Sequence, residues 1–273
     1  MKSRQLLVYV CALFTIFLGT VASEKNFSPY PGYEDGMIVY VNYIEEFLGH
    51  KIKYEETVLP LKAGELQENL IMAKKYLKES IDGGFSPSNE CVAYKMSTGN
   101  SDIWFLPPDV WINMQAAATT WEEEYIIIEY QEDVNGQIWT RNKKIVLDNA
   151  IVLPSHKNRN PLIFASLLIH EYVHQCDREL LKKNGQTYAK KIEEYQTLEG
   201  YIEQEQESYI LESRFFEYMI KEGFYSRADI KFTAWDIFVL SSHIRAYKEY
   251  KKNNLKAYLK YRYNYRFKRQ SRL

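Results

Sequence analysis

Apolar residues recur at helical spacing over most of the chain, and strand-like runs are confined to its middle. Glycines follow two of the helical segments and a pair of prolines precedes a third, as is typical of helix ends and helix starts. The periodicity predicts six helices, over residues 34–48, 65–81, 107–119, 161–184, 192–222 and 229–260.

Between these helices lies a region of short β-branched and aromatic runs. An Asn135-Gly136 turn joins the first two runs and indicates a hairpin. The order of helices, strands and helices predicts an α+β fold with a small antiparallel sheet. The predicted strands cover residues 125–130, 137–141, 145–147 and 151–153.

The N-terminal residues have the pattern of a secretory signal peptide. Lys2 and Arg4 precede an uncharged apolar run, residues 6–18, and small residues follow where a signal peptidase would cut. The run is short for a membrane span, and no other segment is apolar enough to cross a bilayer. We therefore expect residues 1–23 to be removed and the protein to be exported, either secreted or periplasmic; the alternative is an uncleaved N-terminal anchor.

The remaining chain reads as one domain, residues 24–273, with a helical N-terminal lobe over residues 24–110, because no linker or repeat divides it. Removal of the signal peptide would leave two cysteines, Cys91 and Cys176. An oxidising compartment permits a disulfide between them, but the sequence is equally consistent with two separate buried thiols.

Composition excludes several classes of protein. With 46% hydrophobic and 26% charged residues the chain is neither disordered nor fibrous, and a formal net charge of −1 argues against capture of nucleic acid by overall charge. The basic tail, residues 245–273, differs from the rest because it carries eleven lysines and arginines and one acid, Glu249. Its interleaved aromatic and basic residues can hold a nucleic acid, or an anionic lipid or wall polymer. The tail can instead form an amphipathic helix that packs on the acidic body, and we favour this interpretation.

One stretch of the predicted helix over residues 161–184 contains candidate metal-binding and catalytic residues. His170-Glu171-Tyr172-Val173-His174 is a His-Glu-x-x-His motif, whose two histidines lie one helical turn apart on the same face and can bind one metal ion. The intervening Glu171 can accept a proton from a metal-activated water. Asn160 and Pro161 suit the start of this helix, so the motif falls inside a well-bounded helix.

The next predicted helix offers a third ligand. Its apolar residues follow steps of four and three that form an inward-facing seam, and Glu205 and Glu212 occupy positions of that seam. Glu203 and Glu207 lie far round the helix and should face solvent. A carboxylate on a buried seam is costly unless it is paired or coordinates a metal, so Glu205 is the candidate ligand.

These residues resemble the gluzincin metallopeptidases, in which a His-Glu-x-x-His helix is followed by a Glu in a Glu-x-x-Ala/Ser-Asp setting. Residues 205–209 match that setting, with Glu205 in the ligand place, Ser208 in the small-residue place and Tyr209 in place of the Asp. The Asp often supports a ligand histidine in that family, so its support would have to come from another residue, such as Glu212. The resemblance covers roughly residues 145–215.

The resemblance implies a zincin-like architecture, with the active helix under a small sheet whose edge strand pairs with an extended peptide. It implies one catalytic Zn²⁺ held by His170, His174 and Glu205, with Glu171 as the general base. Residues 145–147 or 151–153 would supply the edge strand. His243, Tyr201 and Tyr209 are candidates for stabilising the oxyanion.

The expected function is therefore that of an exported zinc endopeptidase acting on protein or peptide substrates. A zinc-dependent cell-wall amidase with the same ligands, a non-catalytic zincin-fold binding protein, and an exported helical binding protein with a chance motif are the alternatives. We expect no specific nucleic-acid partner and no membrane span after signal cleavage; the basic tail is the segment suited to contact with anionic surfaces.

Overall fold

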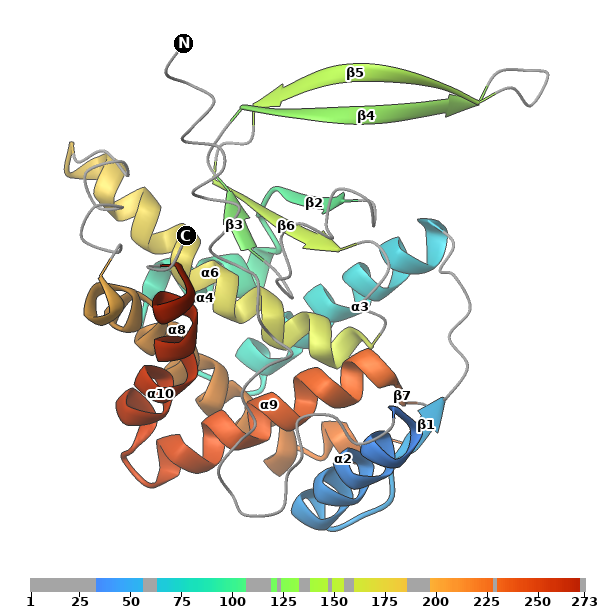
Figure 1. The fold of residues 1–273 in the computed structure, drawn as a ribbon, viewed down its shortest axis with the longest axis vertical. Helices are drawn as coiled ribbons and strands as arrows, with labels where there is room; N and C mark the ends of the chain where they lie inside the picture. Colours follow the sequence, from blue (N-terminus) through green and yellow to red (C-terminus); the bar gives the residue numbers. More distant parts are fainter. Residues whose placement is uncertain are drawn as a thin grey trace.

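Helices carry most of the residues that the structure describes (Figure 1). The computed structural model describes residues 33–55, 63–106, 119–121, 124–132, 138–146, 149–154, 160–185, 197–227 and 230–270. The helices are α2 (Tyr33–Leu48), α3 (Ala63–Asp82), α4 (Glu90–Thr98), α6 (Pro161–Lys183), α8 (Leu198–Lys221), α9 (Ala234–Lys251) and α10 (Leu255–Gln270), with a short 3-10 turn η2 (Phe224–Ser226). None of these helices combines the length and apolar character that a membrane span requires. The predicted signal peptide lies outside the described residues.

The described strands form three separate small sheets. In the first, β1 (Lys53–Glu55) and β7 (Lys231–Thr233) pair in parallel. In the second, β6 (Ala150–Pro154) lies between β2 (Ile103–Leu106), which is parallel to it, and β3 (Thr119–Trp121), which is antiparallel. The third is an antiparallel pair of β4 (Glu124–Glu132) and β5 (Ile138–Val146), which projects from the helical body in Figure 1.

The predicted α+β class with one small antiparallel sheet is therefore wrong, because the described chain is mostly helical and its strands do not assemble into one sheet. Strand β5 joins two of the predicted runs into one strand that pairs only with β4. Asn149 then adopts a left-handed backbone conformation, with φ at 59°, and β6 pairs elsewhere. The parallel partner of β6 is β2, an apolar run that lies before residues 125–153, the region in which we expected the sheet.

Of the two segments predicted as the edge strand for substrate pairing, residues 151–153 do not lie at a sheet edge. Strand β6, which contains residues 151–153, has a partner on each side and is thus the central strand of its sheet. It has no free edge to offer an extended peptide, because β2 and β3 already satisfy its backbone groups. Residues 145–146 belong to β5, which pairs on one side with β4.

Helix α6 occupies the centre of the fold and contacts α3, α4, α8 and α9, as well as β3 and β6 (Figure 1). It begins as predicted: Asn160 accepts a hydrogen bond from the backbone amide of Leu162, and Pro161 occupies the first turn. Residues 162–169 are all buried, as expected of a helix that is apolar on every side. The first half of α6 is therefore enclosed by other elements on all sides.

A single hydrophobic cluster joins the N-terminal helices to the later ones. It contains Ile44 of α2, Leu77 of α3, Met96 of α4, Phe164 of α6 and Phe216 of α8, each fully buried. The helical N-terminal lobe thus packs into the same core as the helix that carries the His-Glu-x-x-His motif.

Three of the predicted helices differ from the structure in their limits. Of the helix expected over residues 192–222, residues 192–196 lie outside the described part, and α8 begins at Leu198. The helix expected over residues 229–260 is two helices, α9 and α10, separated at residues 252–254 where Asn253 takes a φ of 55°. Its first residues form β7, and Thr233 with Asp236 makes a capping box that begins α9. Of the helix expected over residues 107–119, residues 107–118 lie outside the described part and Thr119 begins β3.

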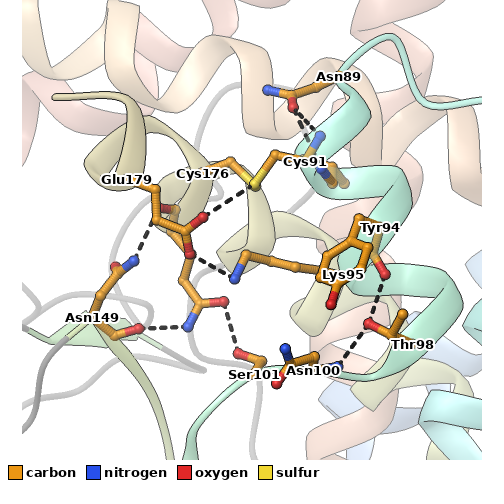
Figure 2. A network of polar contacts seen from close by, with 12 residues as sticks. Asn89, Cys91, Tyr94, Lys95, Thr98, Asn100, Ser101, Asn149, Cys176 and Glu179 are labelled. Carbon is orange, nitrogen blue, oxygen red and sulfur yellow. Dashed lines mark hydrogen bonds and ion pairs between the residues drawn. A yellow bond between two sulfur atoms is a disulfide. The ribbon is translucent and has the colours of Figure 1, made fainter. Parts of the chain in front are cut away.

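Helix α4 is cross-linked to α6 by a disulfide between Cys91 and Cys176, which resolves the two possibilities that the sequence left open (Figure 2). The two Cα atoms lie 5.9 Å apart and are 85 residues apart in the chain. A cross-link that closes a loop of this length typically stabilises a fold by about 2–4 kcal/mol. Cys176 lies two residues after His174, so the disulfide anchors α6 immediately beyond the motif.

Polar contacts around the disulfide reinforce the same attachment (Figure 2). The Lys95 ammonium of α4 lies 2.8 Å from a carboxylate oxygen of Glu179 on α6. The Gln175 amide donates to the backbone oxygen of Asn149, the Asn149 amide donates to that of Gln175, and the Ser101 hydroxyl donates to the Gln175 side chain. These contacts hold α4, the start of β6 and the second half of α6 together.

Candidate metal centre

The two histidines of the motif and Glu205 of α8 come together where α6 and α8 pack side by side. His170 and His174 are one turn apart on α6, and Glu205 faces them from α8. These three form a group, found among the described residues, whose ligand atoms all lie within 4.8 Å of one another and can hold a metal ion. Their side chains are 13%, 9% and 9% exposed, so the group is enclosed.

The orientation of the three side chains suits a metal ion. The Nε2 atom of His170 lies 3.5 Å from Oε2 of Glu205, and the Nε2 atom of His174 lies 3.6 Å from Oε1. Ligand atoms placed tetrahedrally about zinc at about 2.0–2.1 Å would be roughly 3.3–3.4 Å apart. The Oγ of Ser208, at the small-residue position, lies 3.4 Å from Nε2 of His174. The donor set therefore fits a small divalent cation.

The seam predicted for α8 is confirmed by the burial of its glutamates. Glu205 and Glu212 are buried, whereas Glu203 and Glu207 are exposed. Because buried carboxylates are costly unless they are paired or coordinated, the two buried glutamates require partners, and both find them on α6.

Glu212 supports the candidate ligand His170. Its Oε2 atom is 2.9 Å from Nδ1 of His170, and its Oε1 atom is 2.7 Å from Nε2 of His243 on α9. A carboxylate can only accept, so Nδ1 of His170 carries a proton, and Nε2 is the ring nitrogen that faces Glu205. The support that the gluzincin Asp usually supplies is therefore available here from Glu212, two turns further along α8.

The charges of the site favour occupation by a cation. Burial would lower the pKa of His170, but hydrogen bonds and negative charge from Glu205 and Glu212 raise it well above 6.5. Burial lowers the pKa of His174 to about 3; the Glu205 charge opposes this effect, and the charges of His170 and Arg178 add to it. His174 thus stays neutral, as a metal ligand must, while the two carboxylates attract either a proton or a metal ion.

A layer of tyrosines lies beside the three candidate ligands. The Tyr209 ring of α8 stands edge-on to the His170 ring, with centroids 5.0 Å apart. The Tyr209 hydroxyl is 3.1 Å from that of Tyr263 on α10, and the Tyr263 hydroxyl donates to Oε2 of Glu205 at 3.3 Å. This contact brings the C-terminal helix to the metal group, a contribution that sequence reasoning missed.

The first part of the basic tail packs on the body, as the favoured interpretation predicted. Leu255 and Leu259 of α10 are buried against α8, and Lys256 and Lys260 lie 2.9 Å and 3.5 Å from the Glu199 carboxylate. Tyr263 follows Leu255 and Leu259 at intervals of four residues, which places it on the same buried face. That spacing is the signal by which the sequence could have identified Tyr263.

The three candidates for stabilising an oxyanion occupy different places. His243 contacts the far side of Glu212 and is therefore separated from the ligand atoms by that carboxylate and His170. The Tyr201 ring packs edge-on against Tyr263, with centroids 4.8 Å apart. Tyr209 is the candidate that contacts a ligand histidine directly. Glu171, the predicted general base, is buried at 6% exposure between the two histidines in the sequence of α6.

Comparisons with protein-family models, curated proteins and solved structures found no match to this chain. The resemblance to the gluzincins therefore rests on the motif and on the residues brought together around it. The geometry brings Glu205, the third ligand predicted from the sequence, to both histidines and places the Glu212 carboxylate on Nδ1 of His170.

Proposed function

We propose that this protein is an exported zinc-dependent endopeptidase of the gluzincin type. The observation that carries the proposal is the enclosed group of His170, His174 and Glu205, in which both Nε2 atoms face the same carboxylate. Two imidazoles and one carboxylate are a common ligand set of catalytic zinc in peptidases, where the fourth position remains open to water or substrate. The substrate would be a protein or peptide.

The choice of zinc follows from the ligand chemistry. Imidazole nitrogens suit zinc, whereas calcium and magnesium prefer oxygen ligands throughout. The ligand histidine is also held in the manner typical of zinc sites, with a carboxylate accepting from the ring nitrogen that does not face the metal. When bound, zinc supplies a Lewis acid that polarises the scissile carbonyl and lowers the pKa of bound water to about 7.

The protein would contribute the proton transfers. Glu171 accepts a proton from the attacking water and delivers it to the leaving amine, a role in which general acid–base catalysis typically contributes 10²–10⁴-fold. Glu212 keeps His170 oriented, and the contact of Glu212 with His243 fixes the Glu212 carboxylate in turn. Of the three residues considered for stabilising the oxyanion, Tyr209 is the one whose ring contacts a candidate ligand histidine.

The presence of Glu171 favours an enzyme over a protein that only binds metal. Glu171 is 6% exposed, and a site that only holds zinc does not need a base beside its ligands. Its place between the two histidines on α6 is that of the base in the His-Glu-x-x-His motif.

Metal content and cleavage together test the proposed activity. Purified protein is expected to contain one zinc per chain and to cleave peptides in a proteome-derived library, and chelation should abolish cleavage until zinc is restored. Zinc without cleavage of peptides would contradict the endopeptidase proposal and favour a wall-peptide amidase or a binding role. Protein that binds no metal would contradict all of these and leave a helical binding protein.

Export is supported by the N-terminal sequence and by the disulfide. Disulfides persist in oxidising compartments, and Cys91 and Cys176 form one in this fold. We expect the mature protein to start near Glu24 and both of its cysteines to resist thiol reagents until they are reduced. N-terminal sequencing and thiol titration of material from the culture medium or periplasm check this expectation. Cytoplasmic protein that retains Lys2 would contradict it.

A further inference from the structure

The C-terminal helix reaches the candidate metal centre through one side chain. The hydroxyl of Tyr263 on α10 lies 3.3 Å from Oε2 of Glu205, and this same oxygen faces Nε2 of His170. Tyr263 is 58 residues from Glu205 in the chain, so the contact depends on how α10 packs rather than on a local turn.

The hydrogen bonds around Tyr263 have a defined direction. An ionised carboxylate can only accept, so Tyr263 uses its one hydroxyl hydrogen on Glu205. The Tyr263 oxygen is then left to accept from the hydroxyl of Tyr209, 3.1 Å away. A chain of two donors thus ends on the carboxylate oxygen that faces His170, and it restricts rotation of that carboxylate.

Packing holds Tyr263 in place. Leu259 and Leu255, one and two turns earlier on α10, are 0% and 5% exposed. The neighbouring Arg262 donates at 2.9 Å to the Ser242 hydroxyl of α9, and the Tyr201 ring packs against that of Tyr263. The hydroxyl therefore belongs to an anchored segment, unlike the exposed Tyr261 two positions before it.

We propose that Tyr263 is a positioning residue of the metal centre, which holds the Glu205 carboxylate in the orientation that a metal ion requires. The C-terminal helix is then part of the site. Lys256 and Lys260 of this helix are exposed, whereas Tyr263 contacts Glu205. This inference rests on the proposed metal site but not on the identity of the substrate. Outer hydrogen-bond partners of metal ligands typically contribute 10–100-fold to metal affinity.

The test compares Tyr263→Phe with a matched control, Tyr261→Phe, in the full-length protein. Zinc affinity is measured by competition with a chromophoric chelator, and the visible spectrum of the Co²⁺-loaded protein reports ligand geometry. Tyr263→Phe is expected to bind zinc 10–100-fold more weakly and to alter the Co²⁺ spectrum. Tyr261→Phe should match the parent in both measurements. Parent-like affinity and spectrum in Tyr263→Phe would overturn the inference while leaving the metal site intact.

A double-mutant comparison separates positioning from general destabilisation. In a Glu205→Gln background, Tyr263→Phe should cause little further loss of zinc affinity, because the carboxylate that it orients is absent. An equal loss in both backgrounds would overturn the inference and indicate a structural role. A parent protein that binds no zinc would overturn the proposed function, and this inference with it.

Discussion

Replacing Glu171 by glutamine is expected to reduce peptide cleavage by about 10²–10⁴-fold while zinc remains bound. The substitution keeps the size and burial of the side chain but removes the carboxylate that accepts the proton. Glu171 is not one of the three described residues whose ligand atoms gather, so its loss should leave the zinc stoichiometry at one per chain. Turnover of a cleaved peptide and metal analysis of the same preparation measure the two effects.

His170→Ala supplies the comparison for Glu171→Gln. His170 faces Glu205 through Nε2, so its removal should abolish both zinc binding and cleavage. If Glu171→Gln loses zinc as completely as His170→Ala, Glu171 is a ligand and not a base. If Glu171→Gln retains full turnover, the proposed mechanism fails and the metal group has another role.

The helices that carry the candidate site were predictable because their signals are local. Asn160 and Pro161 mark the start of α6, and the four-and-three spacing on α8 separates buried Glu205 from exposed Glu203. A helix fixes which side chains share a face, so a metal ligand on such a face can be inferred from spacing alone.

The arrangement of the strands was not predictable in the same way. Strand propensity and the Asn135-Gly136 turn indicate the β4–β5 hairpin, but they do not say which strand β6 will join. Strand partners are chosen by packing and by distant segments such as β2, about 45 residues earlier in the chain. The sequence therefore predicted the β4–β5 hairpin but not the separation of the described strands into three sheets.

The role of α10 was obscured by its composition. Eleven basic residues in the tail suggest a solvated surface, but composition averages over all faces of a helix. The break at Asn253 turns α10 back so that Leu255, Leu259 and Tyr263 pack toward α8. A contact such as that between Tyr263 and Glu205 depends on this long-range packing, and no local pattern specifies it.

Glu205→Ala is expected to lower zinc affinity by more than about 100-fold, a larger loss than removal of an outer hydrogen-bond partner typically causes. Glu205 is the carboxylate that both Nε2 atoms face, and alanine leaves two histidines without a third ligand. In this variant Glu212 still pairs with Nδ1 of His170, so that buried histidine keeps a carboxylate partner and the metal-free variant should remain folded. Chelator competition measures affinity, and thermal unfolding of the metal-free protein checks the fold.

Glu203→Ala and Glu207→Ala are the matched controls on the same helix. Both carboxylates are exposed, and that of Glu203 lies at the edge of ion-pair distance from Lys256, at 4.0 Å. Surface changes of this kind typically alter stability by less than about 0.5 kcal/mol, and neither side chain can approach a metal held by α6. Zinc retained in Glu205→Ala but lost in Glu207→Ala would mean that α8 presents another face to α6. The assignment of the third ligand would then be wrong.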